Sequence, residues 1–191
     1  MSIPNLLTLF RVAMIPVFIA FFYADDALMY FFSAVIFLAA VLTDALDGHL
    51  ARKWNQTSAF GAFLDPVADK LLVVMCLCIL IEYHYSAYFT VPAMVIIARE
   101  FIVSALREWM AEIGQRVSVA VSSLGKVKTG TQMTALVMFL LVPAAQGWFA
   151  WAYWPLIVVA YILFYVATVL TVWSMVDYLR QAWPVLNNGK T

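Results

Sequence analysis

The sequence contains few charged residues for its length. Only 12% of its 191 residues are Asp, Glu, Lys or Arg, whereas 65% are hydrophobic and the mean hydropathy is +0.93. A typical soluble domain has about 25% charged residues, so this chain lacks the polar surface that a water-soluble globule needs. Its eleven cations and eleven anions cancel, which gives no overall attraction for nucleic acid. The composition therefore predicts a membrane protein that does not bind nucleic acid.

Cysteine is almost absent, and strand-like patterns are missing. Cys76 and Cys78 lie two residues apart in an uncharged run, where helical side chains point in different directions, so no disulfide is expected. The chain also lacks the alternating apolar and polar pattern of membrane β-strands. The first apolar stretch has no preceding basic segment and no clear cleavage site, so we expect no removable signal peptide. These absences favour an all-α membrane protein.

What the sequence does contain is a series of long apolar stretches. A membrane span needs about 20 apolar residues, so the chain has room for about six helices in a single transmembrane domain covering residues 1–191. A turn is expected near Pro143 to Trp148, where proline and glycine interrupt the last long stretch. The predicted helices are 5–24, 28–52, 58–83, 89–112, 122–143 and 149–177.

Lysine and arginine are distributed unevenly among the predicted turns. The turns after the first, third and fifth helices contain no cation, although the first contains Asp25 and Asp26. The positive-inside rule places the opposite side in the cytoplasm, together with both termini. That side collects Arg52, Lys53, Arg116, Lys126, Lys128, Arg180 and Lys190.

Several charged residues remain within or at the ends of the apolar segments. On insertion scales each costs about 2.5–3.5 kcal/mol at the centre of a membrane, so nine of them indicate a function. Most fall in the cytoplasmic half of their helices and could converge on a polar cavity open to the cytoplasm. The nine residues are Arg11, Asp44, Asp47, Asp65, Asp69, Lys70, Arg99, Glu100 and Arg107.

Four aspartates form the most informative group. Asp44 and Asp47 are three residues apart near the end of the second helix, and Asp65 and Asp69 are four apart near the start of the third. Each pair shares a helix face, and a short turn makes the two helices expected neighbours. Four facing carboxylates would repel one another, whereas hard divalent cations would turn this repulsion into coordination. The donor set predicts Mg²⁺ or Mn²⁺, with two ions as in two-metal phosphoryl chemistry.

Small residues accompany these acids. Gly48, Ala51 and Gly61 lie within about one helical turn of an aspartate and leave space beside the carboxylates. One interpretation is a groove for a ligand. The alternative is that small residues only allow the two helices to pack closely, as they do in other membrane proteins.

These residues together resemble the signature of a known family. The fixed positions match that of the CDP-alcohol phosphatidyltransferases, in the order Asp44-x2-Asp47-Gly48-x2-Ala51-Arg52-x8-Gly61-x3-Asp65-x3-Asp69. The resemblance implies six transmembrane helices, often a homodimer, and a cytoplasm-facing site. It also implies transfer of a phosphatidyl group from a CDP-linked lipid such as CDP-diacylglycerol to an alcohol, with release of CMP.

The resemblance also implies roles for individual residues. It assigns the metal ions to Asp44, Asp47 and Asp65, with Asp69 nearby as a further metal ligand and the general base. A carboxylate is suited to accept the proton of an attacking hydroxyl. The residues implied to line the nucleotide site are Gly48, Ala51, Arg52 and Gly61. Asn5 and Thr8 either contact the nucleotide or cap the first helix.

The acceptor alcohol is suggested by three further stretches. Residues 3–11, 99–112 and 117–132 resemble bacterial family members that use glycerol 3-phosphate, which implies a bacterial inner membrane location with several spans. A phosphorylated acceptor needs cations, and Arg107, Lys126 and Lys128 are candidates. Alternatively, these cations only satisfy the positive-inside rule. The resemblance leaves the metal identity, acyl-chain preference, oligomeric state and the role of Arg99 and Glu100 open.

Two other functions compete with this interpretation. A cardiolipin synthase of the same fold would use phosphatidylglycerol as its acceptor. An ion or proton transporter would also place acids within the membrane, because such residues mark ion pathways. Here, however, the acids crowd one side of the membrane and no acidic relay continues through the last two helices, which argues against transport.

Overall fold

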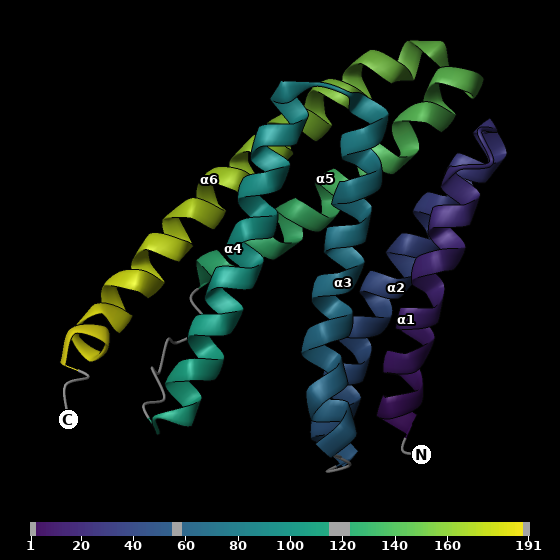
Figure 1. Cartoon of the computed structure of the whole chain (residues 1–191). Helices are drawn as coiled ribbons and strands as arrows, with labels where there is room; N and C mark the ends of the chain where they lie inside the picture. The colour runs from purple at the N-terminus through teal and green to yellow at the C-terminus, as the bar shows by residue number, and fades with distance from the viewer. Residues whose placement is uncertain (1–2, 55–58, 115–122, 189–191) are drawn as a thin grey trace.

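The computed structural model describes the backbone of residues 3–54, 59–114 and 123–188, and the side chains of residues 6–43, 61, 64, 66–114 and 127–183. Within these ranges the fold is all-helical, as the sequence predicts, with short turns after α1, α3 and α5 (Figure 1). The helices are α1 Ile3–Phe22, α2 Ala27–Trp54, α3 Ala59–His84, α4 Ala87–Glu112, α5 Ser123–Trp148 and α6 Ala150–Asn188.

Local side-chain bonds mark the turns at one end of the bundle. The Leu28 amide donates to Asp26 Oδ1 over 2.9 Å at the start of α2, so this acid caps a helix rather than only facing solvent. Ser86 caps α4 in the same way, accepting a bond from the Tyr88 amide. Asp25 and Tyr85 lie just after α1 and α3 with φ of 52° and 40°, the left-handed conformation that ends many helices.

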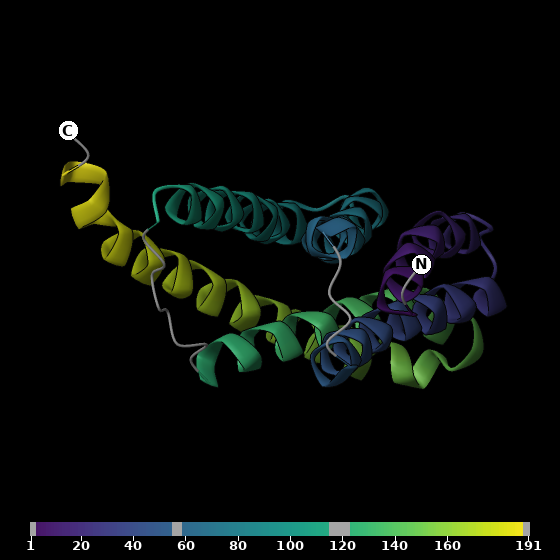
Figure 2. The ribbon, with the colours of Figure 1, turned by 90° about the horizontal axis from the view of Figure 1, so that it is seen from below.

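The helices run alternately up and down the bundle. Both chain ends lie at the same end of the molecule, which agrees with an even number of helices (Figure 1). Seen along the helices, α3 and α4 form one layer and α2, α5 and α6 form another (Figure 2). The largest packing contacts join α5 to α6, α1 to α2, α2 to α5, α1 to α3 and α4 to α6. The aspartate-bearing helices α2 and α3 are therefore both held against α1.

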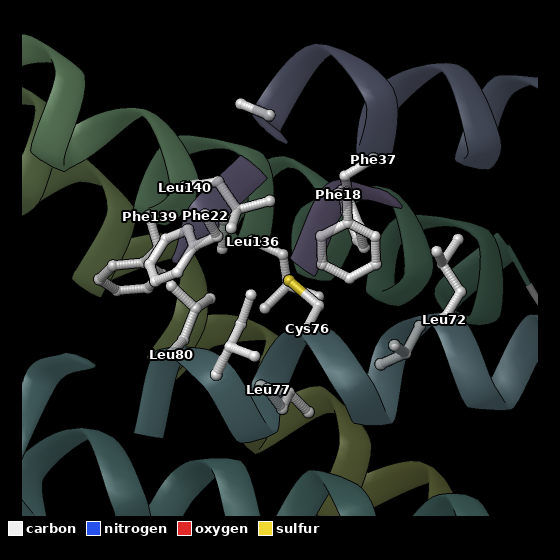
Figure 3. Packing of buried hydrophobic residues seen from close by; sticks show 14 of the residues in the cluster. Phe18, Phe22, Phe37, Leu72, Cys76, Leu77, Leu80, Leu136, Phe139 and Leu140 are labelled. Carbon is white, nitrogen blue, oxygen red and sulfur yellow. The ribbon is translucent and has the colours of Figure 1, made fainter. Parts of the chain in front are cut away.

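A core of phenylalanine and leucine side chains fixes this arrangement. Phe18 of α1 and Phe37 of α2 meet edge to face with ring centroids 5.6 Å apart, above the buried side chains of α3 (Figure 3). Phe89 of α4 stacks on Phe164 of α6 at 4.8 Å and contacts Phe139 of α5 at 4.9 Å. Buried aromatic pairs of this kind contribute about 0.5–1.5 kcal/mol beyond their area. The core therefore connects all six helices.

The two cysteines behave as expected. Cys76 is buried within the core, Cys78 is exposed, and both are free thiols. Cys76 lies between the leucines of α3 in Figure 3 and acts as a small apolar side chain.

Two predicted boundaries are wrong. The break expected at Pro143 to Trp148 comes later, at Phe149, because α5 continues through Pro143 and ends at Trp148. A proline removes only one helical hydrogen bond, and membrane helices tolerate it when neighbouring groups compensate. The last helix continues to residue 188 rather than ending at 177. Its polar extension is supported by a bond of 2.9 Å from Gln181 to Asp177, one turn earlier.

Among the described residues, three segments are long and apolar enough to cross a membrane by themselves. These are Ala87–Glu112, Val127–Trp148 and Ala150–Trp183, and two shorter apolar segments are Leu6–Phe22 and Ala27–Thr43. Large apolar side chains cover the outside of the bundle, for example Trp151, which is 80% exposed, and Trp173, which is 70% exposed. An outer surface of this kind is suited to lipid rather than water.

Candidate active site

The four motif aspartates lie on two helices at one end of the bundle. The backbone of α2 is helical through Asp44 and Asp47, and that of α3 is helical through Asp65 and Asp69. Spacings of three and four residues therefore place each pair on a shared helix face, as expected. The segments that carry them lie at the same end as both termini (Figure 1).

Only part of the predicted site has described side chains. Asp69 is exposed on α3 and Gly61 is buried one turn before Asp65. No group of three metal-binding side chains occurs among the residues whose side chains are described. The predicted metal and ligand residues outside that set are Asp44, Asp47, Asp65, Asn5, Gly48, Ala51, Arg52 and Lys126.

Helix α1 contributes two fully buried polar residues near the same end. Thr8 and Arg11 both have 0% exposed surface, and each has at least one interaction partner. A buried guanidinium in an apolar helix requires polar or anionic surroundings, and α1 packs against both aspartate-bearing helices. The helix begins at Ile3, so Asn5 and Thr8 lie inside it. The alternative that these two residues cap the helix is therefore wrong.

Lys70 connects the aspartate-bearing α3 to the next helix. Its ammonium group donates to the hydroxyl of Ser104 on α4. Beside this bond, α3 and α4 enclose a largely apolar cavity of about 320 Å³ that Phe101 and Glu108 also line. Lys70 is thus a cation directed toward α4, next in sequence to Asp69.

A buried ionic network joins the last three helices. Glu100 Oε1 on α4 accepts a bond of 2.9 Å from Lys128 Nζ on α5 and one of 3.1 Å from its neighbour Arg99. The other terminal nitrogen of Arg99 donates to Ser174 Oγ on α6 over 2.8 Å. The side chains of Lys128, Arg99 and Glu100 are only 6%, 11% and 20% exposed. We call the four residues Arg99, Glu100, Lys128 and Ser174 the cation network.

Arg107 lies on α4, two turns after Arg99. Its guanidinium donates to the hydroxyl of Tyr178 on α6 over 2.6 Å. The same group lies 4.9 Å from the centre of the Tyr178 ring, a cation–π contact. Unlike Lys128, Arg107 is exposed, so its remaining donors are accessible. Two of the three predicted acceptor-binding cations therefore project from α4 and α5, and both contact other helices.

Several buried polar atoms around the cation network have no partner among the described residues. They are Arg99 Nε, Gln132 Oε1 and Thr171 Oγ1. Gln132 lies one turn after Lys128, and Thr171 one turn before Ser174, so each shares a face with a member of the network. Buried polar atoms are normally hydrogen-bonded to protein, water or ligand. The network therefore has unused capacity to bind a polar molecule.

Comparison with known proteins identifies the family. The family model for CDP-alcohol phosphatidyltransferase matches residues 1–173. The chain belongs to the CDP-alcohol phosphatidyltransferase family. Membership confirms the resemblance drawn from the aspartate motif and argues against an ion or proton transporter.

Bacterial members of this phosphatidyltransferase family are similar over nearly the whole chain. A protein of Escherichia coli K12 and one of Shigella flexneri serotype 5b are each 52% identical over 95% of this chain and 94% of their own. A protein of Salmonella paratyphi A is 53% identical over the same shares. All three are named CDP-diacylglycerol–glycerol-3-phosphate 3-phosphatidyltransferase.

The structure adds residues to the candidate site that the sequence analysis missed. Ser174 and Tyr178 hold the two arginines of α4, and Gln132 and Thr171 are buried polar residues beside the cation network. A signal for them exists in the sequence, because all but Tyr178 are polar residues within the charge-free stretch 129–176. Their partners could not be found in this way, since each contact joins helices distant in sequence.

Proposed function

We propose that this phosphatidyltransferase transfers the phosphatidyl group of CDP-diacylglycerol to sn-glycerol 3-phosphate, producing phosphatidylglycerophosphate and CMP. The observation that carries the proposal is the shared name of relatives 52–53% identical over 95% of the chain. The reaction feeds the synthesis of phosphatidylglycerol and cardiolipin. The buried Lys128 and the exposed Arg107 support a phosphorylated acceptor, because a phosphate monoester requires cations.

Two divalent cations, Mg²⁺ or Mn²⁺, would be held by Asp44, Asp47, Asp65 and Asp69. The donor set fits such ions, because it consists of carboxylates paired on the faces of α2 and α3. When bound, the ions would stabilise the negative charge that develops on the pyrophosphate and improve CMP as a leaving group.

The remaining steps fall to the residues of the chain. In the proposed reaction the acceptor hydroxyl attacks the phosphorus of the phosphatidyl group, forming a new P–O bond while the bond to CMP breaks. Asp69, exposed on α3, accepts the hydroxyl proton. Arg107, Lys126 and Lys128 bind the phosphate of the acceptor, which orients its free hydroxyl toward the reacting phosphorus.

The nucleotide is proposed to lie beside the aspartates. Gly48, Ala51 and Gly61 lack large side chains there, and Gly61 is buried in α3. Arg52 supplies a cation for the pyrophosphate. From α1, Thr8 is the better supported contact, because it is fully buried and does not cap the helix, while Asn5 lies one turn before it.

We further propose that all six helices cross a bacterial inner membrane, with both termini and the active site cavity on the cytoplasmic side, and that two copies form a homodimer. Surface labelling tests the orientation. A cysteine at position 25 should react with an impermeant thiol reagent from outside the cell, and one at position 55 only from the cytoplasm. The reverse labelling pattern would refute the proposed orientation.

One assay with a panel of acceptors tests the activity. Purified protein in detergent is mixed with labelled CDP-diacylglycerol, Mg²⁺ and either glycerol 3-phosphate, glycerol, serine or phosphatidylglycerol. We expect CMP release and a labelled lipid product only with glycerol 3-phosphate. Product with phosphatidylglycerol alone would instead identify a cardiolipin synthase, and equal rates with glycerol would exclude a phosphate-binding site.

A further inference from the structure

The cation network has an unusual composition for a site that binds an anion, because its centre is a carboxylate. Glu100 Oε1 accepts from both Lys128 and Arg99, over 2.9 Å and 3.1 Å. A negative charge at this point would by itself repel a phosphate. Its geometry shows a different effect, since a single oxygen fixes the position of two cations from α4 and α5 relative to each other.

The need for such a fixed point follows from the chemistry of the two cations. A lysine side chain is flexible, and its ammonium group has three donors of which Glu100 accepts one among the described residues. The other two donors have no partner among the described residues. Without the carboxylate, the like charges of Lys128 and Arg99 would repel each other in a site that is almost completely shielded from water.

The surroundings of the network also point to a polar ligand. Arg99 Nε, Gln132 Oε1 and Thr171 Oγ1 are buried and have no partner in the described part of the chain. The bond from Arg99 to Ser174 continues the network to a third helix, α6. Three helices therefore converge on a buried, polar and incompletely satisfied site.

From this geometry we infer that Glu100 is a positioning residue, which holds Lys128 and Arg99 in the orientation that binds the phosphate of the acceptor. The inference rests on the proposed function, because it assumes that Lys128 binds glycerol 3-phosphate. Glu100 itself does not contact the substrate. It acts through the two cations and through the helices α4 and α5 that it connects.

The first test is the variant Glu100→Gln, assayed as full-length protein in detergent. Glutamine keeps the size and one acceptor oxygen but removes the charge. We expect the KM for glycerol 3-phosphate to rise about five- to tenfold, while kcat and the KM for CDP-diacylglycerol change less than about twofold. A merely structural ion pair would instead lower the active fraction, reducing the rate with both substrates and leaving both KM values unchanged. That result, or an unchanged or lower acceptor KM, overturns the inference.

A double variant tests whether Glu100 acts through Lys128. Lys128→Met alone should raise the acceptor KM, and adding Glu100→Gln to it should raise the KM by less than about twofold more. If the KM increases of the two single variants multiply in full, Glu100 acts independently of Lys128, and the inference is overturned. If Lys128→Met itself leaves the acceptor KM unchanged, the proposed phosphate site fails. If only Glu100→Gln has no effect, the site stands and the positioning role fails.

Two further variants guard against misfolding and unspecific effects. Glu100→Asp keeps the charge but shortens the side chain by one methylene, so it should raise the acceptor KM about threefold, and no change would overturn the inference even if Glu100→Gln fails to fold. Glu112→Gln is the matched control, because Glu112 is exposed on the same helix and forms no ion pair among the described residues. This variant should change neither KM.

Discussion

The two ends of the bundle use acidic residues in different ways. At the end that contains the turns after α1 and α3, each acid has a neutral partner nearby. The hydroxyl of Tyr30 donates to Asp25 over 2.7 Å, and the hydroxyl of Tyr23 donates to Glu82. The bond to Glu82 raises the pKa of Tyr23, so the hydroxyl remains protonated and acts as a donor at neutral pH. These hydrogen bonds satisfy the acids at this end, and the bond from Tyr23 to Glu82 joins the end of α1 to α3.

The opposite end concentrates charge on separate helices. The aspartates lie on α2 and α3, and the cations Arg99, Arg107 and Lys128 lie on α4 and α5. At this end buried polar atoms still lack partners among the described residues. An acid at the end of an apolar helix is therefore not by itself evidence of a functional site. What distinguishes the aspartate-bearing end is opposite charge separated onto neighbouring helices, because a buried polar atom without a described partner, His84 Nε2, also occurs at the other end.

The largest expected effect comes from the aspartates. Asp→Asn at position 44, 47, 65 or 69 should lower kcat by about 10²-fold or more, because metal binding or proton transfer is lost while the helices stay intact. Initial rates at saturating substrate measure this loss. Asp25→Asn is the control from the other end, since an amide oxygen can still accept the Tyr30 bond, and it should retain nearly full activity. Nearly normal rates for two of the four motif variants would refute the metal site.

Removal of divalent cations tests the same end without a mutation. Chelation with EDTA should abolish product formation, and Mg²⁺ or Mn²⁺ should restore it, since the proposed chemistry depends on cations held by carboxylates. Product formation is followed with labelled CDP-diacylglycerol before and after adding back each ion. Activity that persists after chelation would exclude a readily exchangeable divalent cation.

An intermediate effect is expected from the acceptor-binding cations. Neutral variants of Arg107, Lys126 or Lys128 should raise the KM for glycerol 3-phosphate about tenfold, because a charge-assisted hydrogen bond contributes about 1.5–3 kcal/mol. The KM for CDP-diacylglycerol should change far less, since its proposed contacts lie on α1, α2 and α3. Steady-state kinetics with each substrate varied in turn separate the two values. Unchanged acceptor KM values in all three variants would contradict the assignment.

The sequence was sufficient for the local features of this molecule and insufficient for its contacts. Apolar runs predict six helices whose starts lie within two residues of those observed, because each long apolar stretch is bounded by polar or turn-forming residues. The Pro143 boundary is wrong because a proline does not always end a helix that is supported on several sides. The error lies in assuming a rule suited to exposed helices.

In the candidate site, too, local features could be predicted from the sequence and contacts between helices could not. Lys128 and Arg107 could be selected from their charge at the ends of apolar segments, but the sequence does not show that Lys128 meets Glu100 or that Arg107 meets Tyr178. These pairs are 28 and 71 residues apart, and their meeting depends on how α4, α5 and α6 pack. The aspartate motif was easier to find, because all four acids lie within two consecutive helices and follow helical spacing.

The smallest expected effect concerns how tightly α5 packs at two glycines near its opposite ends. A Cβ atom added at Gly147 would lie 2.8 Å from Ala27 Cβ on α2, whereas one added at Gly130 would meet nothing within 4 Å. Gly147→Ala should therefore force α2 and α5 apart, and overpacking of this kind costs about 1–3 kcal/mol. Gly130→Ala should instead stabilise the fold by up to about 1 kcal/mol, because alanine favours a helix more than glycine does.

Thermal unfolding of both alanine variants in the same detergent measures this difference. The helical preference for alanine is common to both positions, so the difference between the two variants reports the close contact of α5 with α2. We expect Gly147→Ala to unfold at a lower temperature than Gly130→Ala, with the original protein between them or close to the lower value. Equal unfolding temperatures would mean that the end with satisfied acids is no more tightly packed along α5 than the charged end. The contrast between the two ends would then rest on their polar groups alone.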